Sequence, residues 1–180
     1  MTATANSPPV RVIDNLGDYQ VRLDFAEEIA RVLESLPDHA VAGLGSVVLR
    51  VTSSLTSKES KTVVRSGTRR AAPAITNGTY SHGSSTRQPA IQLFVDNIVS
   101  EWPAWVVRVP ILRYEIVNRV LCHELGHHIQ ALQKPGRPQS EAEARRLGAR
   151  LMRRSFARRH PLLLPLVKAA LWLRGLSRAS

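Results

Sequence analysis

The chain has 180 residues, of which 43% are hydrophobic. This is enough for one domain with a hydrophobic core, and a second domain is not expected. Its single cysteine excludes an internal disulfide framework and fits a reducing compartment or a cofactor-free oxidising one. The formal net charge is +11, and residues 134–180 carry 12 Lys and Arg against 2 Asp and Glu, so the basic character belongs to the C-terminal quarter.

Residues 1–9 are small and polar and end in two prolines, which predicts a disordered arm. No basic stretch followed by an apolar one is seen there, so no secretory signal is expected and the cytoplasm is the predicted location, with a peripheral membrane position as a variant. We expect residues 10–160 to form the domain. Residues 161–180 are expected to form an apolar and basic helix packed on that domain or on a membrane surface.

Several elements are expected in the first half of the chain. Apolar side chains follow a helical period between residues 18 and 36. Residues 47–52 are rich in β-branched side chains and predict a strand, whereas residues 53–70 are rich in Ser, Thr, Lys and Arg and predict a loop or flap. Asn77-Gly78 is typical of a tight turn.

Residues 90–95 are the most strand-like stretch of the sequence. We expect this strand to form a sheet edge along which an extended peptide could lie, because backbone hydrogen bonds at an edge can bind a peptide. Residues 96–108 contain two tryptophans and predict a short helix or loop that covers the core.

Residues 110–133 show the clearest helical period. Pro110 is acceptable in the first turn, and the Lys-Pro-Gly-Arg-Pro run at 134–138 is typical of a helix stop. The apolar positions of this helix are Ile111, Leu112, Ile116, Val117, Val120, Leu121, Leu125, Ile129 and Leu132.

This helix carries the pattern His-Glu-x-x-His. Because residues four apart share a helix face, His123 and His127 can both direct an imidazole nitrogen at one ion, and Glu124 is placed to accept a proton from water at that ion. The pattern predicts a zinc site with its general base; the alternative is a buried helix whose histidines are satisfied by hydrogen bonds. Cys122 points about 100° away from His123 around the helix, which predicts a buried structural thiol.

A second helix is predicted from Ser140 to about Arg159. Ser140 and Glu143 form the sequence pattern of a capping box, in which each side chain caps the other's backbone amide. One face is small and apolar, and arginine dominates the rest. Residues 162–173 are apolar but fall short of the roughly 20 residues that cross a bilayer.

A catalytic zinc ion usually takes three protein ligands. The candidates for the third ligand are His82, His128, His160, Glu141 and Glu143. His128 follows His127 directly and therefore points away from the metal-binding face. A carboxylate is favoured, because the short loop at 135–139 returns the second helix antiparallel to the first. Glu143 has the capping role, so Glu141 is the preferred ligand and Glu143 the alternative.

His123-Glu124-Leu125-Gly126-His127, followed by Glu141-x-x-Ala144, resembles the Glu-zincin (gluzincin) metallopeptidases, particularly the minimal intracellular SprT-like and ImmA/IrrE-type proteins. The segments 78–80 and 91–94 are similar to the strand pair that these domains place before the metal helix. The resemblance covers about residues 75–156, and the chain departs from the larger families at Arg145, where they often carry Asp or Asn. It implies an α+β, zincin-like fold, with a small mixed sheet packed on the active-site helix and additional C-terminal helices. It also implies Zn²⁺ held by two histidines and one glutamate, and peptide-bond hydrolysis.

We therefore expect a zinc metallopeptidase that hydrolyses a narrow set of protein substrates, with water activated by Zn²⁺ and Glu124. The alternative is a catalytically silent zincin-fold module with a binding or regulatory role. Tyr80 and His82 are weak candidates for stabilising the oxyanion. Residues 145–178 are expected to contact an anionic membrane surface or nucleic acid, or else to form a solvated helix face.

Overall fold

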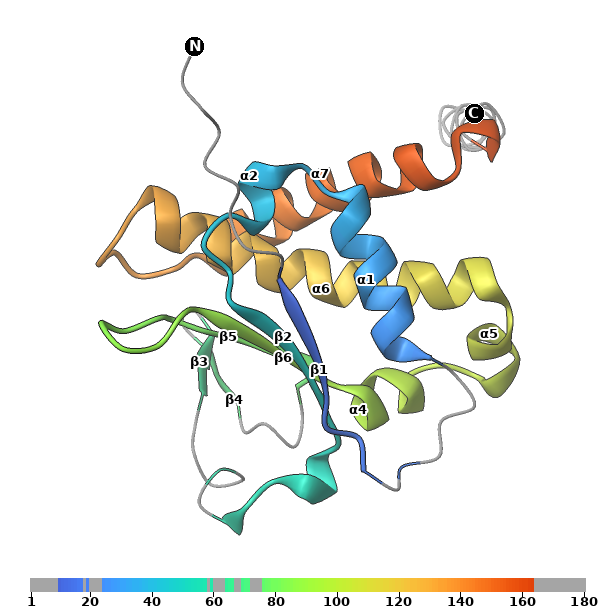
Figure 1. Ribbon diagram of the computed structural model, residues 1–180, viewed down its shortest axis with the longest axis horizontal. Coiled ribbons are helices and arrows are strands. Elements are labelled where there is room, and N and C mark those ends of the chain that lie inside the picture. The colour runs from blue at the N-terminus through green and yellow to red at the C-terminus, as the bar shows by residue number, and fades with distance from the viewer. Residues whose placement is uncertain are drawn as a thin grey trace, which may run out of the picture.

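The computed structural model describes residues 10–17, 19, 24–57, 59, 64–66, 69–71 and 76–163, which form a mixed α+β structure (Figure 1). A small four-stranded sheet lies beside a group of helices. The α+β class predicted from the sequence is thus confirmed. The arm predicted at residues 1–9 and most of the helix predicted at 161–180 lie outside the described residues.

The sheet has the strand order β1-β2-β6-β5. The first three strands are mutually parallel, and β5 runs antiparallel to β6, with Gly78 opposite Leu93 and Tyr80 opposite Ile91. The strand bounds are Arg11–Asp14 for β1, Ser46–Arg50 for β2, Gly78–Ser81 for β5 and Ala90–Phe94 for β6.

The expectation that the strand at 90–95 forms the sheet edge is wrong. Four of the five residues of β6 are buried, which is typical of an interior strand, and β6 pairs with β2 on one side and β5 on the other. The outer strand next to it is β5. The outer strand beside the predicted metal helix is therefore the shorter, more polar β5, which β3 also contacts.

Two further expectations change. Asn77-Gly78 is not a tight turn: Gly78 opens β5, and the backbone N–H of Phe94 donates to the carbonyl of Asn77 at 2.9 Å. The stretch at 53–70 is only partly a loop. It contains the end of a short 3₁₀ helix, η1 (Thr52–Ser54), and the first of two antiparallel strands, β3 (Val64–Ser66) and β4 (Arg69–Ala71).

The helices include the two that were predicted most strongly. Helix α6 lies along the sheet in contact with β5 and β6, and α7 packs against α6 (Figure 1). The helix bounds are Phe25–Ser35 for α1, Asp38–Val41 for α2, Val95–Ser100 for α4, Ala104–Arg108 for α5, Pro110–Gln133 for α6, Glu141–Arg159 for α7 and Pro161–Leu163 for the 3₁₀ helix η3.

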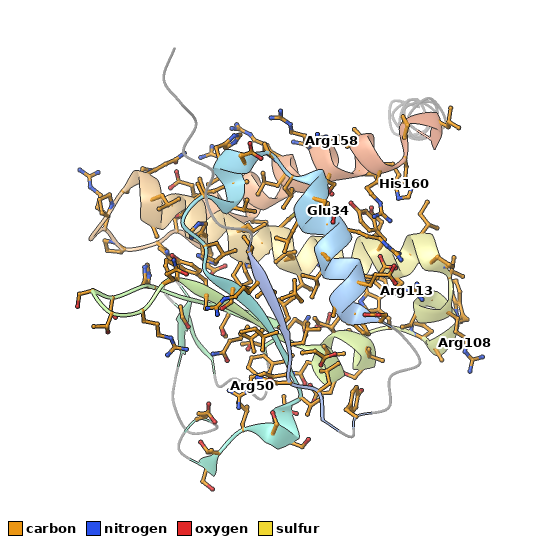
Figure 2. All side chains as sticks on the ribbon, viewed as in Figure 1. Glu34, Arg50, Arg108, Arg113, Arg158 and His160 are labelled. Atoms are coloured by element: carbon orange, nitrogen blue, oxygen red, sulfur yellow. The ribbon has the colours of Figure 1, made fainter. Side chains whose placement is uncertain are left out.

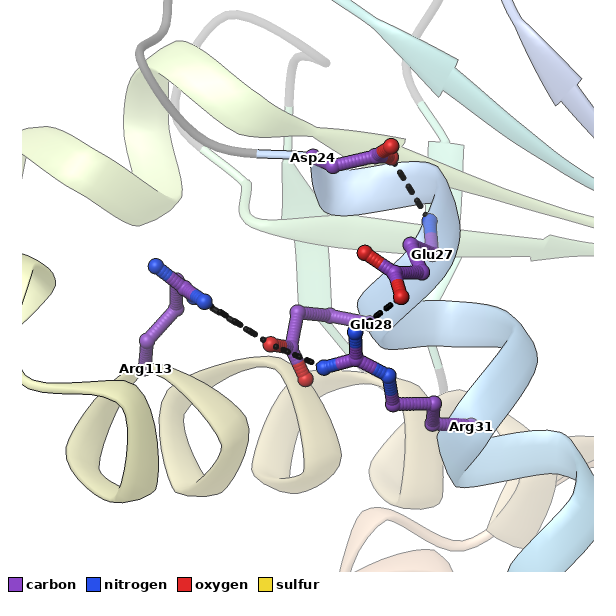
Figure 3. A network of polar contacts seen from close by, with 5 residues as sticks. All are labelled: Asp24, Glu27, Glu28, Arg31 and Arg113. Atoms are coloured by element: carbon purple, nitrogen blue, oxygen red, sulfur yellow. Dashed lines mark hydrogen bonds and ion pairs between the residues drawn. The ribbon is translucent and has the colours of Figure 1, made fainter.

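Helix α1 begins later than predicted and is fastened to α6 by a buried carboxylate. Asp24 caps the helix by accepting from the backbone N–H of Glu27 at 2.8 Å. Glu28 is 2% exposed, and its Oε1 accepts from Arg31 on the same helix and from Arg113 on α6, each at 3.0 Å (Figure 3). A buried charge needs such partners, so this cluster fixes the position of α1 on the N-terminal half of α6.

A buried hydroxyl cluster joins α1, α6 and α7. The hydroxyl of Tyr114 on α6 hydrogen-bonds to Ser155 on α7, and Ser155 hydrogen-bonds to Ser35 on α1. All three side chains are buried. The cluster fixes the C-terminal part of α7 against α6, far along the helix pair from the histidines.

Among the described helices, none is long and apolar enough to cross a membrane.

Candidate metal centre

His123 and His127 lie one turn apart on α6, as their spacing predicts. Their ring centroids are 5.0 Å apart, and the planes are nearly perpendicular. His127 is 1% exposed, whereas His123 is partly exposed. Both Nε2 atoms approach the same carboxylate, so the two rings face one point in space.

That carboxylate belongs to Glu141, the first residue of α7. Its Oε2 lies 3.4 Å from Nε2 of His123, and its Oε1 lies 3.4 Å from Nε2 of His127. The candidate ligand atoms of the three residues lie within 4.8 Å of one another. Ligand atoms of a tetrahedral Zn²⁺ with bonds of about 2.0–2.2 Å are about 3.4 Å apart, so these donors suit zinc in both chemistry and spacing.

Glu143 lies outside this group. Its carboxylate pairs with Lys134 at 2.8 Å, and this ion pair lowers the pKa of Glu143. The predicted capping box forms only by half: the hydroxyl of Ser140 accepts from the backbone N–H of Glu143 at 3.3 Å, but the reciprocal bond is replaced. The backbone N–H of Ser140 donates instead to Oε1 of Gln130 on α6. The capping argument for preferring Glu141 was therefore incomplete, although Glu143 does have another partner.

Two side chains, Gln130 and Gln139, hold the start of α7 against the end of α6. Oε1 of Gln130 accepts from Ser140 N–H at 2.8 Å, while its Nε2 donates to the Ser140 carbonyl at 3.1 Å. Gln130 is 4% exposed, so water does not compete freely for these bonds. Nε2 of Gln139 donates to the carbonyl of His127 at 3.0 Å. Because Glu141 follows Ser140 directly, these contacts fix the third candidate ligand relative to the histidines.

Small residues let the two helices approach closely beside the site. A Cβ at Gly126 would lie 2.3 Å from the carbonyl oxygen of Ala144, and one at Gly148 would lie 2.7 Å from the carbonyl oxygen of Cys122. Both obstacles are backbone atoms, which cannot move aside as a flexible side chain can. The buried Ala144 continues this contact, on the face of the helix that the sequence predicts to be small and apolar.

Glu124 lies beside the ligand group and is enclosed by the sheet. It is 6% exposed, and its side chain lies against Gly78 of β5, where a Cβ would come within 3.0 Å of Cγ. Burial, assisted by the charge of Glu141, raises the pKa of Glu124 to about 8. In this environment Glu124 tends to keep its proton. Positive charge nearby favours the ionised carboxylate, which is the form that can accept a proton.

The charges around the histidines come from both helices. Burial lowers the pKa of His123 and of His127, which keeps neutral imidazoles available as ligands, and the carboxylate of Glu141 opposes this effect. The guanidinium groups of Arg145 and Arg119 act on His123 in the same direction as burial.

A cleft of about 720 Å³ opens beside His123 and Glu124. One wall is formed by residues 76–78, which lead into β5, and the others by α6 and α7. A cleft of this volume is large enough for an amino-acid side chain and adjoining peptide groups. The general-base candidate and one ligand candidate therefore both line this cleft.

The other candidate ligands lie elsewhere. His128 is fully buried, with Nε2 2.9 Å from the carbonyl oxygen of Ala42 and Nδ1 3.3 Å from the hydroxyl of Tyr80. His82 is exposed and packs edge-on against Tyr80. His160 lies at the C-terminal end of α7 beside Tyr114 and Phe156 (Figure 2).

Tyr80 is a weaker oxyanion candidate than the sequence indicates, because its hydroxyl faces His128 and not the ligand group. Cys122 is buried, as predicted, and its thiol donates to Oδ1 of Asn118 at 3.0 Å. Burial raises the pKa of this thiol, so it remains protonated and is unsuited to ligate a metal.

Sequence reasoning missed Gln130 and the three glycines that shape the site. Nothing in the type or spacing of Gln130 indicates that it holds Ser140. Ala144 and Gly148 carry a weak signal, because small residues four positions apart on one helix favour close packing against a second helix. Gly78 was taken as a turn residue, since Asn-Gly more often forms a turn than the start of a strand.

Comparisons of the chain with protein-family models, with curated proteins and with solved structures give no match. The resemblance to gluzincins therefore rests on the motif residues alone.

Proposed function

We propose that this protein is a zinc-dependent metallopeptidase with a zincin-like domain, in which His123, His127 and Glu141 bind Zn²⁺ and Glu124 is the general base. The observation that carries the proposal is the convergence of the two imidazole Nε2 atoms on the carboxylate of Glu141, each at 3.4 Å. Such a donor set, next to a buried carboxylate that it does not include, is typical of a hydrolytic zinc site.

Zn²⁺ at such a site supplies Lewis acidity toward a peptide carbonyl and toward water. The protein's own part in the reaction falls to Glu124, which accepts a proton from the attacking water and donates it to the leaving amine. Its contact with Gly78 limits the positions that the carboxylate can take. The general base is thus held in place by the sheet, while the ligands are held by the helix pair.

A peptide substrate is supported by the relation of the cleft to β5. This strand is the outer strand of the four-stranded sheet, and its first residue, Gly78, touches Glu124. An extended chain lying beside β5, which β3 also contacts, would pass the general base and the mouth of the cleft.

The test combines metal content with hydrolysis. Glu124→Gln should retain zinc and lose cleavage of a peptide library by at least about 100-fold, because general acid–base catalysis contributes about 10²–10⁴-fold. Glu141→Ala should lose zinc, whereas Glu143→Ala, two residues away and paired with Lys134, should retain it. Undiminished hydrolysis by Glu124→Gln would exclude the proposed mechanism. Stable zinc binding without cleavage of any peptide would favour a catalytically silent module.

A further inference from the structure

Two arginines stand at the cleft beside the candidate metal centre. Arg119 on α6 and Arg145 on α7 both line it, and both side chains are exposed to solvent. Neither forms an ion pair with any acidic residue that the structure describes. Their charges are therefore available to a ligand in the cleft.

The positions of these arginines follow from the geometry of the helix pair. Arg119 comes one turn before His123, and Arg145 comes one turn after Glu141, so each shares a helix face with a candidate ligand. The helices are antiparallel, because Gly126 lies against Ala144 while Gly148 lies against Cys122. The direction toward the N-terminus of α6 is therefore also the direction toward the C-terminus of α7. Both arginines consequently lie on the same side of the ligand group.

The rest of the cleft has a different character. Val120, Ala149 and Met152 give it an apolar wall, and its two carboxylate neighbours, Glu124 and Glu141, are the ones that the proposed function uses. A site with an apolar wall and two guanidinium groups suits an organic acid better than a free inorganic anion. It also suits a short stretch of peptide better than the repeated phosphates of a nucleic acid, which need many spaced contacts.

We propose that the cleft formed by Arg119, Arg145 and the apolar wall binds a carboxylate of the peptide substrate, next to the bond that is cut. This inference rests on the proposed function, since it names the class of peptide that the same site accepts. The carboxylate comes either from an Asp or Glu side chain or from the C-terminus of the substrate. Guanidinium groups bind both in the same bidentate manner.

Binding to the zinc-loaded full-length protein tests the proposal independently of turnover. In a Glu124→Gln background, fluorescent octapeptides would be compared in two matched pairs: internal Glu against Gln, with the C-terminus amidated, and free against amidated C-terminus, with a neutral sequence. We expect about tenfold tighter binding of the acidic member in at least one pair, as charge-assisted hydrogen bonds predict. The pair that shows the preference identifies the source of the carboxylate.

Charge reversal assigns that preference to the cleft. Arg119→Glu and Arg145→Glu should each reduce the tenfold preference to less than about twofold. Arg150→Glu is the matched control, because Arg150 lies on the opposite face of α7, is exposed, and does not line the cleft. Zinc content and thermal unfolding are measured for every variant, and Arg119→Gln and Arg145→Gln replace any charge-reversal variant that fails to fold.

The outcomes separate this inference from the proposed function. Equal binding of both members in both pairs would overturn the inference, as would a preference that survives both charge reversals, or a DNA duplex that competes as strongly as the acidic peptide. Cleavage of acidic and neutral peptides with equal kcat/KM would also overturn it but leave the peptidase proposal standing. Arginine-dependent selective binding without cleavage of any peptide would support the inference and count against the peptidase.

Discussion

The backbone of Gly78 lies so close to the side chain of Glu124 that a Cβ atom at position 78 would come within 3.0 Å of Cγ and 3.1 Å of Oε1. Gly78→Ala should therefore displace the carboxylate by a few tenths of an ångström. We expect kcat to fall by about tenfold with zinc content unchanged, since small misplacements of catalytic groups are costly. Ser81→Ala, at the other end of β5, is the control. Unchanged kcat in Gly78→Ala would mean that Glu124 can shift without penalty.

Gln130 should matter for metal affinity although it is no ligand. Gln130→Ala removes both hydrogen bonds to the Ser140 backbone and leaves buried polar groups unpaired. We expect a loss of zinc affinity of about tenfold, comparable with losing an outer partner of a metal ligand, measured by competition with a chelator. Gln133→Ala, exposed and one turn away on the same helix, should retain the wild-type affinity. Equal affinities for the two variants would contradict the role given to Gln130.

Gly148→Ala should destabilise the protein, although alanine is the better helix former. On an open helix surface the change would add about 1 kcal/mol of stability. Here the new Cβ would meet the Cys122 carbonyl at 2.7 Å, so α7 must shift, at a cost of about 1–3 kcal/mol. A lower midpoint of thermal unfolding, together with weaker zinc binding, is the expected result. An increase in the midpoint would show that the helices tolerate separation.

Glu115 predicts a pH dependence of stability. Burial raises its pKa, an effect that the neighbouring Asn118 partly opposes. Because the pKa in the folded protein is raised above the unfolded value, the stabilising contribution is complete at low pH and is lost as the pH rises through the folded-state pKa. The free energy of unfolding of the wild type, relative to Glu115→Gln, should therefore fall as the pH rises above the range in which a glutamate ordinarily titrates.

Chemical denaturation at a series of pH values measures this difference. Glu34→Gln provides the control, because Glu34 is exposed on α1 (Figure 2) and makes no hydrogen bond or ion pair with a described residue. A constant difference between wild type and Glu115→Gln across the range would contradict the prediction.

The basic C-terminal region should bind anionic surfaces in a salt-dependent way. Exposed arginines on the outer face of α7 include Arg146, Arg150 and Arg154, and the rest of the predicted region, 164–178, lies outside the described residues. We expect binding to phosphatidylserine vesicles or to duplex DNA that weakens as salt rises, and that falls further when these three arginines are replaced by alanine. Co-sedimentation and fluorescence anisotropy would measure it. Absent or salt-independent binding to both would leave the arginines as a solvated face.

The sequence predicted the elements whose signal is local. The α6 helix has a long apolar period with Pro110 at its start and a breaker at 134–138, and both of its ends were predicted within a residue. Ser140 marked the start of α7 for a similar reason: a capping side chain acts on backbone three residues away. The pair His123 and His127 also depends only on helical spacing.

Relations between distant segments were not predictable in the same way. Strand β1 has only four residues with no strong alternation, and its partner β2 comes more than thirty residues later. The position of β6 inside the sheet depends on which strands reach its two sides, and no local pattern encodes that choice. The contact of Gly78 with Glu124 also joins two elements far apart in the chain. A glycine is needed at position 78 because it leaves room for Glu124, and not because it forms a turn.

All three candidate ligands lie between residues 123 and 141, on two helices joined by one short loop, whereas the sheet pairs segments drawn from residues 11 to 94. Contacts that are close in sequence close small loops and form early in folding, while pairing of distant parallel strands is slow. The proposed function therefore implies that the helix hairpin captures an ion before the sheet is assembled. It also implies that Glu124 reaches its working position only when β5 docks, so that a chain which has just acquired its metal cannot yet cut its neighbours.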